Sequence, residues 1–122
     1  MARSTSTVIA FALVLATSTA TAESQAEIAA RVNAEGEKLL AAKRFVDASS
    51  KFREACARVP APRYFYNLCE SLDDEGKFSE ALTACQASLQ LDPPAELAAK
   101  TRSLMTKIRD EAKRQNIPLH DH

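Results

Sequence analysis

The sequence predicts an all-α protein made of two helix-turn-helix repeats and a C-terminal helix, and three observations lead to this fold class. Its 122 residues include only 2 Gly and 5 Pro and no Trp, whereas a β-sandwich or barrel uses many turn residues. Apolar residues recur at steps of three and four, which is the period of one helix face. The chain also aligns with itself when it is shifted so that Gly36 falls on Cys69.

The segment from Met1 to Ala22 has the three parts of a secretory signal peptide. Arg3 supplies the positive charge, an apolar run covers 8–16, and small residues continue to Ala22. Because a membrane-spanning helix needs roughly 20 apolar residues, a permanent span is the weaker interpretation. We expect cleavage after Ala22, so that the mature chain starts at Glu23. The expected location of the mature chain is the periplasm or the extracellular space.

The first repeat is predicted over 29–61. Its first helix is marked by the apolar residues Val32, Leu39 and Leu40, and a turn follows at Lys43. Pro60 closes the repeat, because proline interrupts a helix. The second helix of this repeat carries the apolar positions Phe45, Ala48, Phe52, Ala55 and Cys56.

The second repeat is predicted over 62–94 and has the same plan. Gly76 supplies the backbone freedom that ends its first helix, and Ser79 is the expected N-cap of its second helix. Pro93 and Pro94 stop the chain again. The positions that coincide between the repeats are Gly36 with Cys69, Leu39 with Leu72, Phe45 with Phe78, Ala48 with Ala81, Ala55 with Ser88, and Pro60 with Pro93.

A third helix pattern covers 95–115. Its apolar stripe consists of Leu97, Leu104, Met105 and Ile108, set among many basic residues. Repeat arrays need an end unit with a polar outer face, so we interpret this segment as a capping helix. A basic helix that binds a membrane surface or a partner is the alternative. Residues 116–122 are expected to form a flexible tail.

These residues resemble the tetratricopeptide repeat (TPR). The second repeat carries the resemblance in the spacing of Phe65, Leu68, Cys69 and Leu72, followed by Ala81, Cys85, Ser88 and Pro93. The first repeat carries it in Gly36, Leu39, Phe45, Ala48, Phe52, Ala55 and Pro60. The resemblance implies a fragment of a right-handed α-solenoid, of the small exported bacterial type. It also implies a concave surface, lined by the first helix of each pair, that binds peptides or partner helices.

The positions of this chain that match the groove positions of the family give a set of predicted groove residues. The alternative is that these residues simply face the solvent. The family also has a clamp for C-terminal carboxylates, built from Lys, Asn and Arg in three repeats. Only Asn67 resembles a member of that clamp, so we reject this specificity. The predicted partner-binding residues are Asn33, Glu37, Leu40, Arg63, Tyr66, Asn67, Glu70, Asp73 and Asp74.

The chain has 3 Cys, so at least one is unpaired. Cys69 and Cys85 lie at equal distances from Lys77 in the predicted turn, and antiparallel helices would bring them to the same level. A disulfide between them is one interpretation, and two small buried hydrophobic residues are the other. Cys56 then remains unpaired. None of the cysteine spacings matches a zinc site.

The balance of charge excludes several function classes. The 16 basic and 16 acidic residues give a net charge of zero, so the chain lacks the cationic excess of nucleic-acid-binding proteins. With 2 His and no Gly-rich loop, the sequence offers no catalytic constellation, so we predict no enzyme and no cofactor. Weak chelation by His120, Asp121 and His122 is a distant alternative, and we predict no metal site.

The sequence therefore predicts an exported adaptor that binds a protein or peptide partner and is not an enzyme. A structural component of the cell envelope that self-associates into homo-oligomers is the alternative. The acidic groups on the expected groove helices include Glu37 and Glu70, while basic residues gather on the C-terminal helix. We accordingly expect an acidic groove that favours a basic partner segment, with Leu40 and Tyr66 as the apolar anchors. The cluster Asp73-Asp74-Glu75 is either solvated or directed at a ligand.

Overall fold

The computed structural model describes residues 22–120, and this part of the chain is all-helical. The signal peptide predicted over 1–22 lies outside the described residues except for its last position, and so do Asp121 and His122 of the weak chelation alternative. The helices are α1 (Gln25–Ala41), α2 (Phe45–Arg58), α3 (Pro62–Asp74), α4 (Phe78–Gln90) and α5 (Ala95–Arg114). Between residues 22 and 120, no helix is long and apolar enough to cross a membrane.

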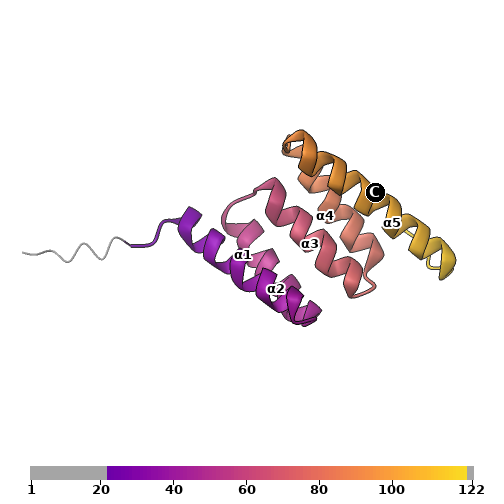
Figure 1. Ribbon diagram of the computed structural model, residues 1–122, viewed down its shortest axis with the longest axis horizontal. Coiled ribbons are helices and arrows are strands. Elements are labelled where there is room, and N and C mark those ends of the chain that lie inside the picture. The colour runs from indigo at the N-terminus through magenta and orange to yellow at the C-terminus, as the bar shows by residue number, and fades with distance from the viewer. Residues whose placement is uncertain (1–21, 121–122) are drawn as a thin grey trace, which may run out of the picture.

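The helices form antiparallel pairs that stack side by side (Figure 1). α1 pairs with α2 and α3 with α4, while α2 packs on α3 and α4 packs on α5. α3 also contacts both α1 and α5. In Figure 1, α1, α3 and α5 form the layer nearer the viewer and run in the same direction, with α2 and α4 behind them. One face of the molecule is therefore built from three parallel helices.

The turn inside each pair has the same hydrogen bonds, at equivalent positions of the repeat. The Arg44 N–H donates to the Leu39 carbonyl at 2.9 Å, and the Lys77 N–H donates to the Leu72 carbonyl at 2.9 Å. Both turns need a left-handed residue, Lys43 with φ 60° and Gly76 with φ 78°. α4 begins at Phe78 directly after this turn, so Ser79 lies inside the helix. The prediction that Ser79 is the N-cap was wrong.

The core shows how the two pairs differ at equivalent positions. In the first pair, a Cβ atom on Gly36 would lie 2.6 Å from Cε1 of the Phe52 ring, so only glycine lets α1 approach α2 this closely. In the second pair, Cys69 and Cys85 occupy the matching places and form a disulfide, with 5.3 Å between their Cα atoms. A small residue against a large ring is thus replaced by a covalent link.

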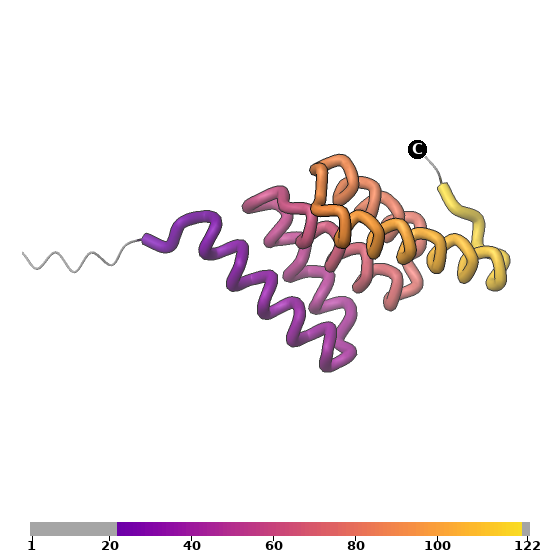
Figure 2. Tube along the Cα trace, turned by 45° about the horizontal axis from the view of Figure 1, so that its top comes forward, coloured from indigo at the N-terminus to yellow at the C-terminus, as the bar shows by residue number. Residues whose placement is uncertain are grey.

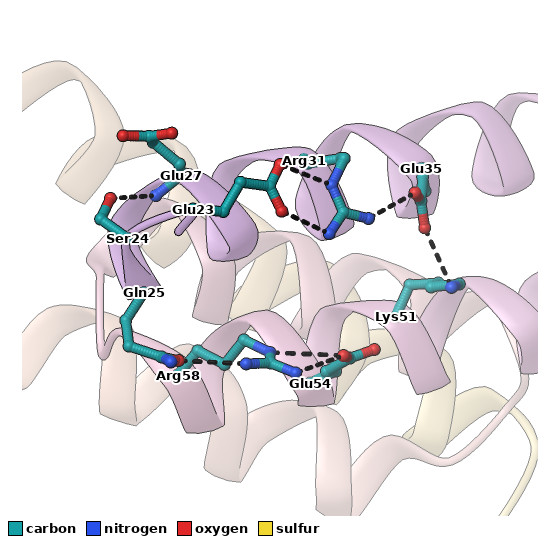
Figure 3. A network of polar contacts seen from close by, with 9 residues as sticks. All are labelled: Glu23, Ser24, Gln25, Glu27, Arg31, Glu35, Lys51, Glu54 and Arg58. Carbon is teal, nitrogen blue, oxygen red and sulfur yellow. Dashed lines mark hydrogen bonds and ion pairs between the residues drawn. The ribbon is translucent and has the colours of Figure 1, made fainter. Parts of the chain in front are cut away.

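A network of exposed polar contacts joins the two helices of the first pair on the outside (Figure 3). Lys51 on α2 pairs with Glu35 on α1 at 2.9 Å, and Arg58 donates to the Gln25 side-chain oxygen at 3.0 Å. Arg31 extends the network along α1 through Glu23 and Glu35. Such exposed pairs contribute at most about 1 kcal/mol each, so the buried residues hold the pair together.

The segment after α5, where the sequence predicts a flexible tail over 116–122, contacts the helix stack in its described part, 116–120. Asn116 has a φ of 54°, and the chain turns back over the end of the helix stack (Figure 2). Leu119 packs against the core, and the His120 N–H donates to the Ser79 hydroxyl at 3.0 Å. The apolar contact of Leu119 favours this position, because it moves apolar surface from the solvent to the core. The flexibility of the tail stays a prediction.

Candidate functional site

A groove runs over the face formed by α1, α3 and α5. One hollow of about 660 Å³ opens between α1 and α3, and a second of about 710 Å³ opens between α3 and α5. Both hollows are lined by Tyr66, Glu70, Asp74 and Lys100, so they meet along α3. We call this continuous depression the α3 groove. Its size is in the range of sites that hold several side chains of a ligand.

Most of the predicted partner-binding residues line the α3 groove, but two do not. Asn33 is buried, and the Asp73 side chain is only 7% exposed. Asp73 instead lies 3.4 Å from the Lys107 ammonium of α5. Partners within the fold hold these two side chains, and their contact with a ligand stays a prediction. The residues that do line the groove are Glu37, Leu40, Arg63, Tyr66, Asn67, Glu70 and Asp74.

A buried amide network forms the floor of the groove between α1 and α3. The Asn67 amide donates to the Asn33 side-chain oxygen at 2.9 Å, and the Asn33 amide donates to the Glu37 carboxylate at 3.0 Å. Asn67 also donates to Glu37, at 3.3 Å. These bonds satisfy the buried polar groups and fix α1 against α3. The network therefore positions the groove, and Glu37 brings its charge to the floor.

Tyr66 lies at the centre of the α3 groove. Its ring is half-buried and packs against the core. Burial raises the pKa of the Tyr66 hydroxyl above its ordinary value, and the negative charge of Glu70 raises it further. The hydroxyl is therefore neutral at physiological pH. The side chain can offer a ligand both an aromatic surface and a hydrogen-bonding group.

The acidic cluster at the end of α3 divides into three separate environments. Asp73 pairs with Lys107, while Glu75 accepts a hydrogen bond from the Ser49 hydroxyl of α2 and lies 3.5 Å from Lys77. Of the three, only Asp74 lines the α3 groove. Desolvation raises the pKa of the Asp74 carboxyl, as does the charge of Asp73, and Lys107 opposes these effects. Asp73 and Glu75 therefore bond within the fold, whereas Asp74 belongs to the groove.

Sequence reasoning missed the contribution of α5 to the groove. Its lining residues follow those of α3 at the repeat period, since Lys100 matches Asn67 and Lys107 matches Asp74. The same shift that revealed the repeats would have found them, had it been applied once more. Lys100 and Lys107 also correct the expected charge, because the groove is mixed rather than acidic throughout. The α5 residues that line it are Glu96, Ala99, Lys100, Ser103, Leu104 and Lys107.

The free thiol of Cys56 is buried on α2 and belongs to the core, not to the groove. Burial raises the pKa of this thiol to about 12. Since the thiolate is the nucleophile, Cys56 is unreactive at neutral pH. Among residues 22–120, no three His, Cys, Asp or Glu side chains converge to hold a metal ion. The chemistry that the α3 groove offers is contact with apolar groups and with charges.

Comparisons with known proteins identify no relative of this chain. No protein-family pattern matches it, no curated protein matches its sequence, and no solved structure matches its fold. Its function is therefore inferred from the groove and from the repeated construction that creates it.

Proposed function

We propose that this chain is a protein-interaction module without enzymatic activity, which binds a peptide or a partner helix in the α3 groove. The observation that carries the proposal is the arrangement of α1, α3 and α5 as one face with a continuous groove centred on Tyr66. Tyrosine is frequent among residues that dominate binding energy, since it combines a large apolar surface with a polar group. The half-buried Tyr66 ring is already held in place, so little ordering remains for binding.

The repeated construction supports a TPR-like solenoid fragment as the framework of this module. The two intra-pair turns share their hydrogen bonds at equivalent positions of the repeat, with Leu39 and Leu72 as the acceptors. α5 ends in the same way, with the Ile117 N–H donating to the Ala112 carbonyl at 2.9 Å. α5 therefore has the features of the first helix of a third, incomplete repeat. In this proposal it caps the array and also extends the binding face.

The proposal places the mature protein outside the cytosol, in the periplasm or the extracellular space. The sequence from Met1 to Ala22 has the pattern of a signal peptide. The Cys69–Cys85 disulfide supports this placement, because structural disulfides persist in oxidising compartments and are rare in the cytosol.

Site-specific photo-crosslinking in the producing cell tests the proposal. A photoreactive phenylalanine analogue replaces Tyr66 in the groove or, as a control, Val46, which is 69% exposed on α2. Val46 lines none of the grooves on the α1, α3 and α5 face. We expect a discrete adduct with another protein from position 66 and none from position 46.

Adducts that form equally from both positions, or only from position 46, would contradict the proposed face. An adduct from position 66 with twice the mass of the chain would identify a second copy as the occupant. That result would favour the self-associating envelope component over an adaptor.

A further inference from the structure

Basic and acidic side chains are unevenly distributed along the α3 groove. Near the N-terminal turns of α3 and α5, Arg63 and Lys100 line the groove together with one acidic residue, Glu96. Toward the C-terminal end of α3, the groove is lined by Glu70 and Asp74, and Lys100 also lines both hollows that contain them. Among residues 22–120, none of Arg63, Lys100, Glu70 and Asp74 takes part in an ion pair. These four charges can therefore meet charges of a ligand, although Glu70 also interacts with the Tyr66 hydroxyl and Asp74 with the charge of Lys107.

Other charged groups at the acidic end do not reverse its sign. Lys107 also lies there, but it pairs with Asp73. Lys43 lines the α1 side of this end together with the carboxylate of Glu37. Lys107 is thus paired within the fold, and Lys43 shares its hollow with Glu37, as Glu96 accompanies Arg63 and Lys100 at the other end. Glu70 and Asp74 are the further charges at the acidic end.

The helix dipoles have the same polarity as the side chains. Because α1, α3 and α5 run in the same direction, their positive N-terminal ends lie at one edge of the face and their negative C-terminal ends at the other (Figure 1). Carboxylates near the C-terminal end of α3 are unfavourable for the helix itself. An acidic ligand-binding function would account for charges that folding alone disfavours.

The separation of the two ends matches a short protein segment. Arg63 and Asp74 are eleven residues apart on α3, which corresponds to about 16 Å at about 1.5 Å per helical residue. An extended peptide spans this length with about five residues. A partner helix spans it in about three turns.

We propose that the α3 groove binds a segment of a partner protein that has opposite charges at its two ends, and that these charges fix its direction. The acidic end of the segment lies at Arg63 and Lys100, and its basic end lies at Glu70 and Asp74. An apolar side chain between them packs on Tyr66. This inference rests on the proposed function and adds to it the chemical pattern and the orientation of the partner. A uniformly basic segment would be repelled at Arg63 and Lys100.

Selection from a displayed library of random dodecapeptides tests the inference at low salt, where charge effects are strongest. The targets are the parent protein, Tyr66→Ala, and two charge-reversed variants, Arg63→Glu with Lys100→Glu and Glu70→Lys with Asp74→Lys. The matched control for the first reversal is Arg102→Glu with Arg109→Glu, which changes the same charge at exposed positions of α5 outside the groove.

We expect the parent to enrich peptides that carry Asp or Glu in one half and Lys or Arg in the other. Each charge reversal should weaken the binding of these peptides by about tenfold, which corresponds to about 1.4 kcal/mol. It should also change the preferred charge in one half of the peptide only. The control should select the same peptides as the parent.

Three other outcomes are informative. Peptides that need Tyr66 but show no separation of charge would overturn the inference and leave the proposed function intact. The inference would also be overturned, and the proposed function left intact, if both charge reversals changed the preferred charge in the same half of the peptide. If the parent enriches no peptides that the Tyr66→Ala protein does not also enrich, the proposed function fails, and the inference fails with it.

Discussion

At the scale of single residues, Gly36 and Phe52 decide how closely the first helix pair can pack. Phe52 is completely buried, and its ring fills the space that a side chain at position 36 would need. Glycine in the interior of a helix is unfavourable by about 1 kcal/mol relative to alanine. Its presence on α1 is therefore explained by the close approach of α2 and not by helix propensity.

Gly36→Ala is expected to lower the melting temperature, although alanine favours helix. Overpacking a core typically costs about 1–3 kcal/mol, which exceeds the propensity gain. In a Phe52→Leu background the same substitution should be neutral or stabilising, because the smaller side chain leaves room for the Cβ atom. Thermal unfolding of the four proteins in this double-mutant cycle measures the coupling. Additive effects would show that the two residues do not compete for space.

Asp74→Asn is expected to raise the melting temperature at pH 7. Desolvation and the charge of Asp73 raise the pKa of the folded Asp74 carboxyl, so the unfolded chain loses this proton at a lower pH. Ionisation therefore disfavours the folded state at a pH above the folded pKa, and this penalty is absent below the unfolded value of about 3.9. Melting curves from pH 7 to pH 4 should show the gain shrinking as the pH falls. A gain that is equal at every pH would exclude ionisation as its cause.

At the scale of helices, the order and the approximate limits of all five elements could be predicted. The three- and four-residue period identified the buried faces, and Gly76, Pro60 and Pro93 marked the ends. Ser79 could not be placed, because the left-handed turn before it starts α4 earlier. The contact of Leu119 could not be predicted, because its site exists only on the folded core.

The disulfide between α3 and α4 is expected to stabilise the second helix pair. It joins residues 16 positions apart, and closing such a loop contributes about 3 kcal/mol on the chain-entropy estimate. Urea unfolding with and without a reductant should show this loss for the parent. The Cys69→Ala, Cys85→Ala double variant is the control and should not respond to the reductant. An unchanged parent, or mapping that recovers both cysteines as free thiols, would contradict the disulfide.

At the scale of the whole molecule, α1, α3 and α5 form one face that carries the α3 groove. The resemblance to the TPR predicted most of the residues that line the α3 groove, among them Glu37 and Glu70, which occupy equivalent places in the two repeats. It could not show that Lys107 neutralises Asp73 or that Asn67 bonds to Asn33, because those contacts join different helices. The mixed charge of the groove could not be predicted, because its lysines Lys100 and Lys107 lie on α5, which is beside α3 only in the folded protein.

The helical domain is expected to associate reversibly or to gain stability from a bound partner. Repeat arrays usually need about three repeats, whereas residues 22–120 contain two helix pairs and the single helix α5. A domain of this size also buries only about 60–70% of its unfolded surface. Sedimentation at several concentrations, together with melting curves, measures both effects. A strictly monomeric protein with high thermal stability at all concentrations would argue against this expectation.

Whether a partner occupies the α3 groove is tested by comparing the two tyrosines of α3. Tyr66 lines the groove, whereas Tyr64 packs against the core and lines none of the grooves on this face. The measurement is the affinity of the partner identified by crosslinking, with a melting curve for each variant. We expect Tyr66→Ala to weaken binding by about 2 kcal/mol or more, as at a binding hot spot, while the domain stays folded. Tyr64→Ala should keep the parent affinity. If Tyr66→Ala binds as the parent does, or if Tyr64→Ala alone loses binding while folded, the partner does not occupy the α3 groove.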